Sequence, residues 1–289
     1  MVSVIEKKTG NSKAYYLHIT LRSNKGYKNL DKYLGTKMPI DLRNKKLEFF
    51  LSSQKEILNK IDSSVLKYKN NIKILPKSIQ DKELLDISIK FTYNTNRIEG
   101  NTLSLKESYL LLKDNISPAK SLRDIKETET HQKLFLKLIK EKQNITYQNM
   151  LNWHYELFKE TSKDISGKIR NYQVKISGSK FIPPTPAELS LELDSFFRWY
   201  NKNNKTMHPI ILSALVHLRL VTIHPFGDGN GRITRLLMNV VLNNSNYPLF
   251  IIDYKNRKGY YSALEKSQVK EDDSYFLNWF IKSYFKSLK

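Results

Sequence analysis

Residues that could perform chemistry gather in one short segment, 224–235, whose sequence is HPFGDGNGRITR. Largely apolar runs at 210–223 and 236–242 flank this segment and are long enough to form buried helices. Between the runs lie a histidine, a carboxylate, three glycines, an asparagine and two arginines. Packing of the flanking helices does not require these residue types, so the segment is a candidate active site.

The segment contains groups that bind phosphate. Gly229 and Gly231 allow the backbone on either side of Asn230 to turn sharply and to approach a ligand closely. The helix expected to follow presents free N–H groups and the positive end of its dipole, which together favour an anion. Arg232 and Arg235 are three residues apart and therefore share a helical face. From that face both guanidinium groups can bind phosphate oxygens.

A metal ligand and a base lie in the same segment. Asp228 precedes the glycine turn, where its carboxylate could hold a Mg²⁺ ion that bridges phosphates. His224 is the group in the segment that can take a proton near neutral pH. A phosphate site, a metal ligand and a base together predict phosphoryl or nucleotidyl transfer. The alternative is a glycine-rich loop with a structural histidine, which the density of special residues makes less favoured.

The segment resembles the signature of the Fic family, His-Phe/Pro-x-x-Asp/Glu-Gly-Asn-Gly-Arg-x-x-Arg, and fills every fixed position. The resemblance implies a protein adenylyltransferase, which transfers AMP from ATP to a Ser, Thr or Tyr hydroxyl of a target protein and releases pyrophosphate. It assigns catalysis to His224 and the Mg²⁺ ion to Asp228. The phosphate-binding residues that it implies are Gly229, Asn230, Gly231, Arg232 and Arg235.

A second pattern lies upstream, at 95–100 (TNRIEG), near the end of a helix expected at about 81–99. It resembles the family's inhibitory motif, Ser/Thr-x-x-x-Glu-Gly/Asn. A glutamate delivered to Arg235 would pair with it and occupy the place that the γ-phosphate needs, so Glu99 is expected to keep AMP transfer low. Two alternatives stay open: Glu99 ends a surface helix, or it positions a water molecule that removes AMP from a modified protein.

Two further assignments follow from the resemblance. The section 166–184 is expected to be non-helical, with strands at 173–176 and 181–182 around a turn. In the family a β-hairpin flap here holds the target side chain over the active site, and Val174, Lys175, Ile176 and Ser177 resemble that flap. Tyr260 and Tyr261 would line the adenine pocket, although core packing is an alternative in a chain with 17 tyrosines.

The N-terminal quarter differs from the rest of the chain. Residues 1–77 carry 17 Lys and Arg against 6 Asp and Glu. A hairpin is expected there, with strands at 14–22 and 27–34 joined by a turn at 24–26, followed by a helix at 43–68. The predicted organisation is therefore a basic N-terminal module, 1–77, and a Fic catalytic domain, 78–289. The fold class expected is mainly α, a helical Fic core with the inserted hairpin plus this strand-containing module.

Charge and composition bound the partners. The formal net charge of +21 favours anionic partners, nucleic acid among them, but a solvated lysine face on a small appendage explains it more simply. The chain has no cysteine, no signal-peptide pattern and no apolar run of the ~20 residues that a membrane span needs. A cytoplasmic protein without a membrane partner is therefore expected.

The acceptor is expected to be a target-protein hydroxyl, with self-modification and a homodimer also open. Two alternatives remain. The enzyme could use a phosphate-containing donor other than ATP, or the protein could be a basic nucleic-acid-binding regulator with a nucleotide pocket. Three histidines outside the segment are expected to be structural, namely His131, His154 and His217.

Overall fold

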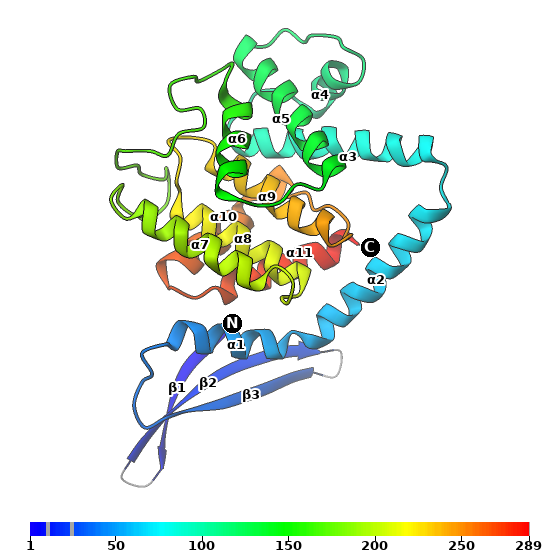
Figure 1. Ribbon diagram of the computed structural model, residues 1–289. Helices are drawn as coiled ribbons and strands as arrows, with labels where there is room; N and C mark the ends of the chain where they lie inside the picture. The colour runs from blue at the N-terminus through cyan, green and yellow to red at the C-terminus, as the bar shows by residue number, and fades with distance from the viewer. Residues whose placement is uncertain (10–11, 24–25, 289) are drawn as a thin grey trace. The chain divides into compact units, whose positions relative to one another are not determined.

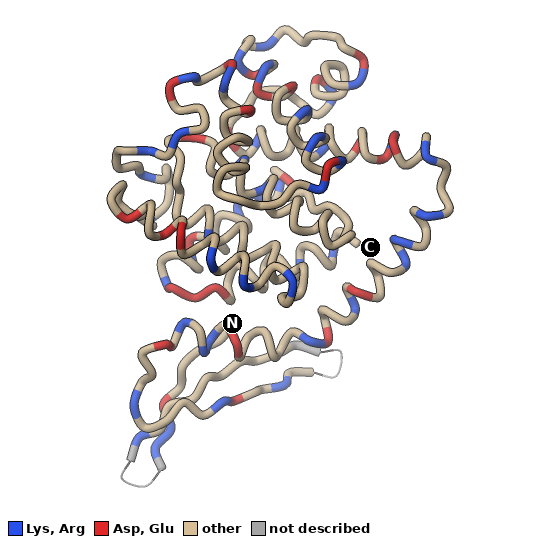
Figure 2. Tube along the Cα trace, viewed as in Figure 1, with Lys and Arg blue, Asp and Glu red and all other residues tan. Residues whose placement is uncertain are grey.

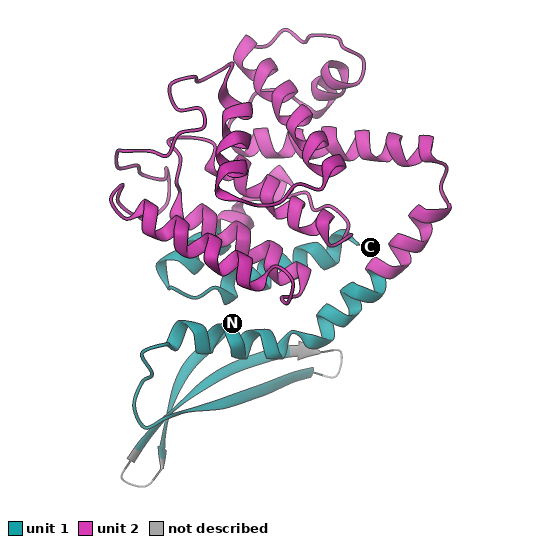
Figure 3. Cartoon of the chain, viewed as in Figure 1, with its two compact units in different colours: residues 1–64, 262–289 teal, residues 65–261 magenta. Residues whose placement is uncertain are grey.

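A computed structural model describes residues 1–9, 12–23 and 26–288 of the chain. The chain divides into two compact units, residues 1–64 with 262–289 and residues 65–261 (Figure 3). The first unit thus includes C-terminal residues that the sequence analysis placed in the catalytic domain. The domain boundary at residue 77 stays a prediction.

The first unit begins with a three-stranded antiparallel sheet, in the order β1 (Ser3–Thr9), β2 (Ser12–Ser23) and β3 (Gly26–Gly35). Strands β2 and β3 form the expected hairpin, with Ile19 paired to Leu30. Two residues of its expected turn, 24 and 25, lie outside the described residues. Strand β1, which pairs along its whole length with β2, was not predicted, because an edge strand rich in charge lacks strong strand signals.

The helix expected at 43–68 is two helices, α1 (Leu42–Ser53) and α2 (Lys55–Ile74), with the break at Gln54. Lysine and arginine recur along both helices (Figure 2). The first unit also contains α11 (Ser274–Ser287), at whose start the buried carboxylate of Asp273 accepts a 2.7 Å hydrogen bond from Arg43.

The second unit is helical and surrounds the 224–235 segment (Figure 1). The helix expected at about 81–99 is α3 (Lys77–Ile98), which begins four residues earlier and ends one residue earlier. Both α2 and α10 (Arg257–Val269) run across the boundary between the units. Its helices are α3 (Lys77–Ile98), α4 (Leu105–Leu112), α5 (Leu122–Glu141), α6 (Tyr147–Phe158), α7 (Leu189–Asn203), α8 (Pro209–Ile223), α9 (Asn230–Asn244), the 3-10 helix η1 (Tyr254–Asn256) and the start of α10 (Arg257–Val269).

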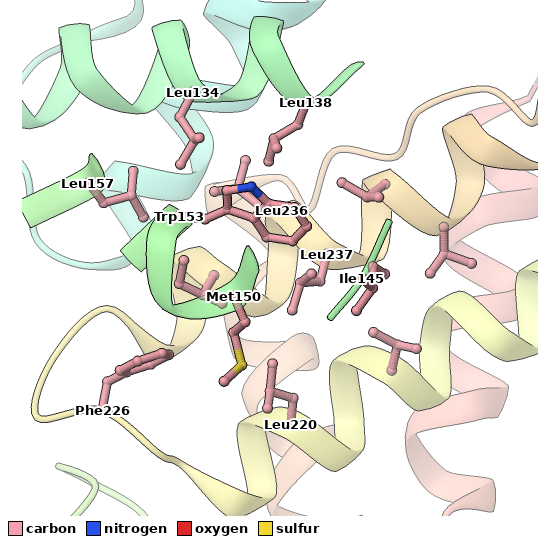
Figure 4. Packing of buried hydrophobic residues seen from close by; sticks show 14 of the residues in the cluster. Leu134, Leu138, Ile145, Met150, Trp153, Leu157, Leu220, Phe226, Leu236 and Leu237 are labelled. Atoms are coloured by element: carbon pink, nitrogen blue, oxygen red, sulfur yellow. The ribbon is translucent and has the colours of Figure 1, made fainter. Parts of the chain in front are cut away.

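One apolar cluster holds these helices together. Figure 4 shows Trp153 of α6 packed among leucines of α5 and α9, beside Met150. Complete burial of one leucine or methionine side chain contributes about 1.5–3 kcal/mol to the stability of the fold. Phe226, from the loop between α8 and α9, is fully buried in this cluster and therefore anchors the candidate site in the core.

The segment between α6 and α7 departs from its prediction. The described residues contain no strand at 173–176 or 181–182, so the predicted hairpin ladder is wrong, although a turn closes as expected with the Ser179 N–H donating to the Ile176 carbonyl. Pro183 lacks the N–H that a ladder needs. Its carbonyl instead accepts a hydrogen bond from the Gln173 side chain at 3.1 Å. We call residues 172–184 the flap segment.

The mainly helical fold with an N-terminal sheet is confirmed. Among the described residues, the helices are all too short or too polar to cross a membrane.

Candidate active site

The loop between α8 and α9 is held in shape by one asparagine side chain. Asn230 accepts a hydrogen bond from the Phe226 N–H at 2.9 Å and donates one to the Phe226 carbonyl at 2.8 Å. Both partners are buried, so loss of these bonds would leave polar groups unsatisfied. The predicted phosphate residue Asn230 therefore shapes the loop through its side chain, and its backbone N–H belongs to the first turn of α9.

Two glycines of the segment have no room for a Cβ unless a neighbouring side chain moves. Gly229 has φ +79, and a Cβ there would lie 2.3 Å from the ring of Phe158. A Cβ on Gly231 would lie 2.2 Å from the Glu99 carboxylate. Gly229 is the N-cap of α9 and offers no side chain to its first N–H groups. The start of α9 thus presents uncapped amides, which favour an anion.

His224 ends α8 with a left-handed backbone, φ 53, and is half-buried. Its Nδ1 lies 3.2 Å from the Val221 carbonyl. Because a carbonyl only accepts, Nδ1 carries the proton and Nε2 is left with its lone pair. Burial lowers the pKa of His224, and Arg170 acts in the same direction, against the contact to Val221 and the charges of Glu99 and Asp228. The imidazole is therefore neutral near pH 7.

Arg232 is buried and pairs with two carboxylates. One terminal nitrogen lies 3.0 Å from Glu127 and the other lies 3.0 Å from Asp228. Its guanidinium group also lies over the ring of Phe158. Arg232 therefore orients Asp228, and its direct contact with a phosphate stays a prediction.

Asp228 offers one partly exposed carboxylate at this point. One of its oxygens accepts a hydrogen bond from the Gly229 N–H. The other oxygen forms ion pairs with Arg232 at 3.0 Å and with Arg123 at 4.0 Å. No group of three His, Cys, Asp or Glu side chains with metal-binding geometry occurs among the described residues. A metal site here would rest on Asp228 alone.

Arg235 and Glu99 meet as the sequence suggested. An Arg235 terminal nitrogen lies 2.5 Å from Glu99 Oε1 and donates to the Thr95 carbonyl at 3.3 Å. The other terminal nitrogen donates to the Tyr260 hydroxyl at 3.4 Å. Arg235 is only 1% exposed, so its charge depends on the Glu99 carboxylate for compensation.

The two tyrosines differ in what they can contact. Tyr260 is buried, and its hydroxyl lies 3.0 Å from Nε2 of His217. Tyr261 is 45% exposed and donates to the Ile98 carbonyl at 3.2 Å. Tyr260 thus contacts the guanidinium group of Arg235 from within the core. Of the two tyrosines, only Tyr261 exposes its ring to solvent. Their adenine-binding role stays a prediction.

Three contributors escaped the sequence analysis, namely Arg170, Glu127 and Arg123. Each comes from an element distant in sequence, so no local spacing connects it to the 224–235 segment. His154, expected to be structural, bridges two loops: the Gly167 N–H donates to its Nδ1, and its Nε2 lies 3.0 Å from the Asp228 carbonyl. Burial lowers the pKa of His154 to about 4, so this bridge is neutral.

Residues of the flap segment lie beside the loop. A Cβ on Gly227 would lie 2.1 Å from the Tyr172 hydroxyl, so Tyr172 covers that glycine directly. The predicted target-binding residues Val174 and Ile176 are half-buried, whereas Lys175 and Ser177 are exposed. Their target-binding role stays a prediction.

The candidate site thus combines a helix N-terminus without a side-chain cap and a neutral histidine within a helical bundle, an arrangement that favours an anion. The family model of the Fic/DOC family matches residues 144–242. Residues 144–242 thus correspond to a Fic/DOC family domain. This match includes His224 and Arg235 but ends before Tyr260 and begins after Glu99, so it does not test those two residues.

Relatives with assigned names cover part of the chain. A protein adenylyltransferase Fic of Nematostella vectensis is 33% identical over 181 residues, which are 61% of this chain and 42% of the relative. One of Drosophila melanogaster is 35% identical over 178 residues, 60% of this chain and 36% of the relative. The chain thus spans less than half the length of these relatives.

Solved structures are similar over a larger share. A Fic domain containing signaling protein of Bacteroides thetaiotaomicron has a TM-score of 0.70 and 25% identity, with coverage of 80% of this chain and 94% of that one. Fic-1 of C. elegans has a TM-score of 0.70 and 26% identity, with coverage of 86% and 74%. The fold expected from the resemblance is therefore confirmed.

Proposed function

We propose that this protein transfers AMP from ATP to a hydroxyl of a target protein or of itself, and that Glu99 restrains the transfer. The observation that carries the proposal is the Glu99 carboxylate, which lies on Arg235 and against Gly231 at the uncapped start of α9. A carboxylate thus lies where we propose that a phosphate of ATP binds. The relatives named as protein adenylyltransferases support the same reaction.

The ATP phosphates would lie at the start of α9. The backbone amides of residues 230–232 and the helix dipole favour their charge. Arg235, the guanidinium that now pairs with Glu99, would bind the terminal phosphate once Glu99 leaves. Glu99 therefore competes with a phosphate for the same cation, and ATP bound beside it would be held in a pose unsuited to transfer.

A Mg²⁺ ion fits the donor set at Asp228. Mg²⁺ is commonly bound through one or two carboxylates plus substrate phosphates, so a single partly exposed carboxylate is sufficient. Arg232 and Arg123 now share that carboxylate, and the ion would take their place. When bound, the ion would neutralise charge on the phosphates.

His224 would act as the general base. Its Nε2 lone pair accepts the proton of a Ser, Thr or Tyr hydroxyl, whose oxygen attacks the α-phosphorus of ATP. The bond from that phosphorus to the bridging oxygen breaks, and pyrophosphate leaves. Arg235 stabilises the charge of the leaving group. The flap segment would hold the target chain over His224, and Tyr261 would stack on the base.

The test is transfer of label from α-³²P-ATP with Mg²⁺, with cell lysate as the source of acceptors. We expect Glu99→Gly to label itself or lysate proteins and Glu99→Gly/His224→Ala to label neither. With γ-³²P-ATP the two variants should give the same background label from lysate kinases, and Glu99→Gly should add none, because the γ-phosphate departs with pyrophosphate. Absence of α-label in every variant would reject the proposal and favour AMP removal, another donor or nucleic-acid binding.

A further inference from the structure

Arg170 is a buried cation whose contacts are made to backbone oxygens. Its side chain belongs to the section between α6 and α7, and the residue is 4% exposed. Nε donates to the His224 carbonyl at 2.8 Å. The two terminal nitrogens donate to the Tyr172 carbonyl at 2.9 Å and to the Pro184 carbonyl at 2.6 Å. The Arg170 backbone N–H adds a 3.0 Å bond to the Pro225 carbonyl.

The three carbonyls belong to the flap segment and to the proposed base, which must be aligned with each other during AMP transfer. Tyr172 and Pro184 are the two ends of the flap segment, and His224 is the base of the proposed reaction. One planar guanidinium group therefore fixes both ends of the flap segment relative to the backbone of the base. A guanidinium donates in several fixed directions at once, whereas an ammonium group on a flexible stem does not impose such geometry.

No strand pairing supports the flap segment within the described residues, so side-chain contacts take over this task. Gln173 makes one such contact, to the Pro183 carbonyl. Arg170 makes two and adds the connection to His224. A buried charge is costly to place, and its use here indicates that the backbone geometry on both sides needs to be held.

We propose that Arg170 is a positioning residue that holds the flap segment in register with His224. The proposal rests on the function proposed above for the same site. Arg170 also places a positive charge next to the imidazole, which helps to lower the pKa of His224, while Glu99 and Asp228 raise it. Burial is the main cause of the lowered pKa of His224, and Arg170 would add to that effect as well as align the base.

The contacts by which Arg170 holds the flap segment are called the Arg170 clamp. Limited trypsin digestion tests this clamp without any need for activity. Lys175 and Lys180 are exposed cleavage sites within the flap segment, and native-state cleavage there tracks local opening. In Arg170→Lys and Arg170→Gln we expect cleavage after these lysines to rise about tenfold, from loss of the charged hydrogen bonds. Arg198→Gln, which removes an exposed arginine of α7, is the matched control and should leave cleavage unchanged.

Titration of His224 by NMR separates charge from geometry. Arg170→Gln should raise the pKa of His224, whereas Arg170→Lys and Arg198→Gln should leave it in place. Cleavage spread over the whole chain in Arg170→Gln would indicate that this variant unfolds. The result for Arg170→Lys would then decide whether Arg170 holds the flap segment. Unchanged flap cleavage in Arg170→Lys, with an unchanged melting temperature, would overturn the proposal.

Transfer kinetics in the Glu99→Gly background complete the test. Adding Arg170→Lys should lower kcat about tenfold with an unchanged KM for ATP, since the hydroxyl and the base are misaligned while the phosphate site stays intact. Failure of Glu99→Gly itself to transfer AMP would reject the proposed function and not the clamp. Transfer by Glu99→Gly that Arg170→Lys leaves unaffected would reject the clamp and not the function.

Discussion

Glu99 and Arg235 are 136 residues apart in sequence and 2.5 Å apart in the structure. Arg235 is buried on α9, and Glu99 follows the last residue of α3, where its side chain remains partly exposed. The pair therefore joins a fixed cation of the phosphate site to a carboxylate at a helix end, which local movement can withdraw.

Tyr261 should strengthen this restraint through its bond to the Ile98 carbonyl, one residue before Glu99. Tyr261→Phe removes the bond and keeps the ring. We expect it to raise basal AMP transfer about threefold in the wild-type background, the effect of one hydrogen bond of modest strength. In the Glu99→Gly background it should have no effect. A threefold rise that persists without Glu99 would contradict this coupling.

Tyr261→Ala separates the second role proposed for this residue. If the exposed ring stacks on adenine, its removal should raise the KM for ATP about tenfold, from loss of about 1–3 kcal/mol of stacking. Tyr261→Phe should leave that KM unchanged, because it retains the aromatic face. Equal KM values in the two variants would show that Tyr261 does not bind the base.

Gly229 should tolerate no side chain. Gly229→Ala combines a left-handed backbone with a Cβ placed 2.3 Å from the Phe158 ring. Gly178→Ala is the matched control, because Gly178 has φ +73 with nothing within 4 Å of the added Cβ. Strain alone should cost Gly178→Ala about 1–2 kcal/mol of unfolding free energy. Denaturant titration should show a larger loss for Gly229→Ala, and equal losses would contradict the clash.

Asn230 should carry much of the stability of the loop. Asn230→Ala leaves the buried N–H and carbonyl of Phe226 without their partner, which should cost about 2–4 kcal/mol. Asn152→Ala, at an exposed position of α6, is expected to change the unfolding free energy by less than about 0.5 kcal/mol. Thermal and denaturant unfolding of the two variants provide the comparison.

Acid should destabilise the fold through its buried histidines. Burial lowers the pKa of His154 to about 4 and of His131 to about 3, from the usual value of 6.5. Below pH 6.5 the unfolded chain therefore binds protons that the folded chain does not, so stability should fall as the pH drops from 6.5 toward 4. The denaturant midpoint should be constant between pH 7 and 8 and decrease at pH 5. A denaturant midpoint that stays constant down to pH 5 would contradict the proposed effect of the buried histidines on stability.

Local patterns allowed much of the site to be predicted. The 224–235 segment concentrates its chemistry in consecutive residues, and Glu99 lies at a helix end whose apolar spacing is clear, so both were found before the structure. The contact between Glu99 and Arg235 depended on the family resemblance, and the structure places the two groups together.

What could not be predicted depends on the tertiary fold. Arg170 reaches the 224–235 segment through the His224 carbonyl, 54 residues away, and Glu127 reaches it through Arg232, and their own neighbours in sequence give no sign of this. Spacing alone does not tell which face of α10 is covered, so the burial of Tyr260 and its contact with Arg235 were not predicted, while its place in the adenine pocket stays a prediction. The flap strands were wrong because alternation of residues does not ensure a pairing partner.

The Glu99 carboxylate is proposed to restrain AMP transfer by occupying Arg235. The most direct measurement is the initial rate of label incorporation from α-³²P-ATP by wild type, Glu99→Gly and Glu83→Gly, which alters an exposed residue of the same helix. We expect a rate at least about tenfold higher for Glu99→Gly, from loss of about 1.4 kcal/mol or more of competition, and a wild-type rate for Glu83→Gly. Equal rates for wild type and Glu99→Gly, with both transferring AMP, would contradict this restraint.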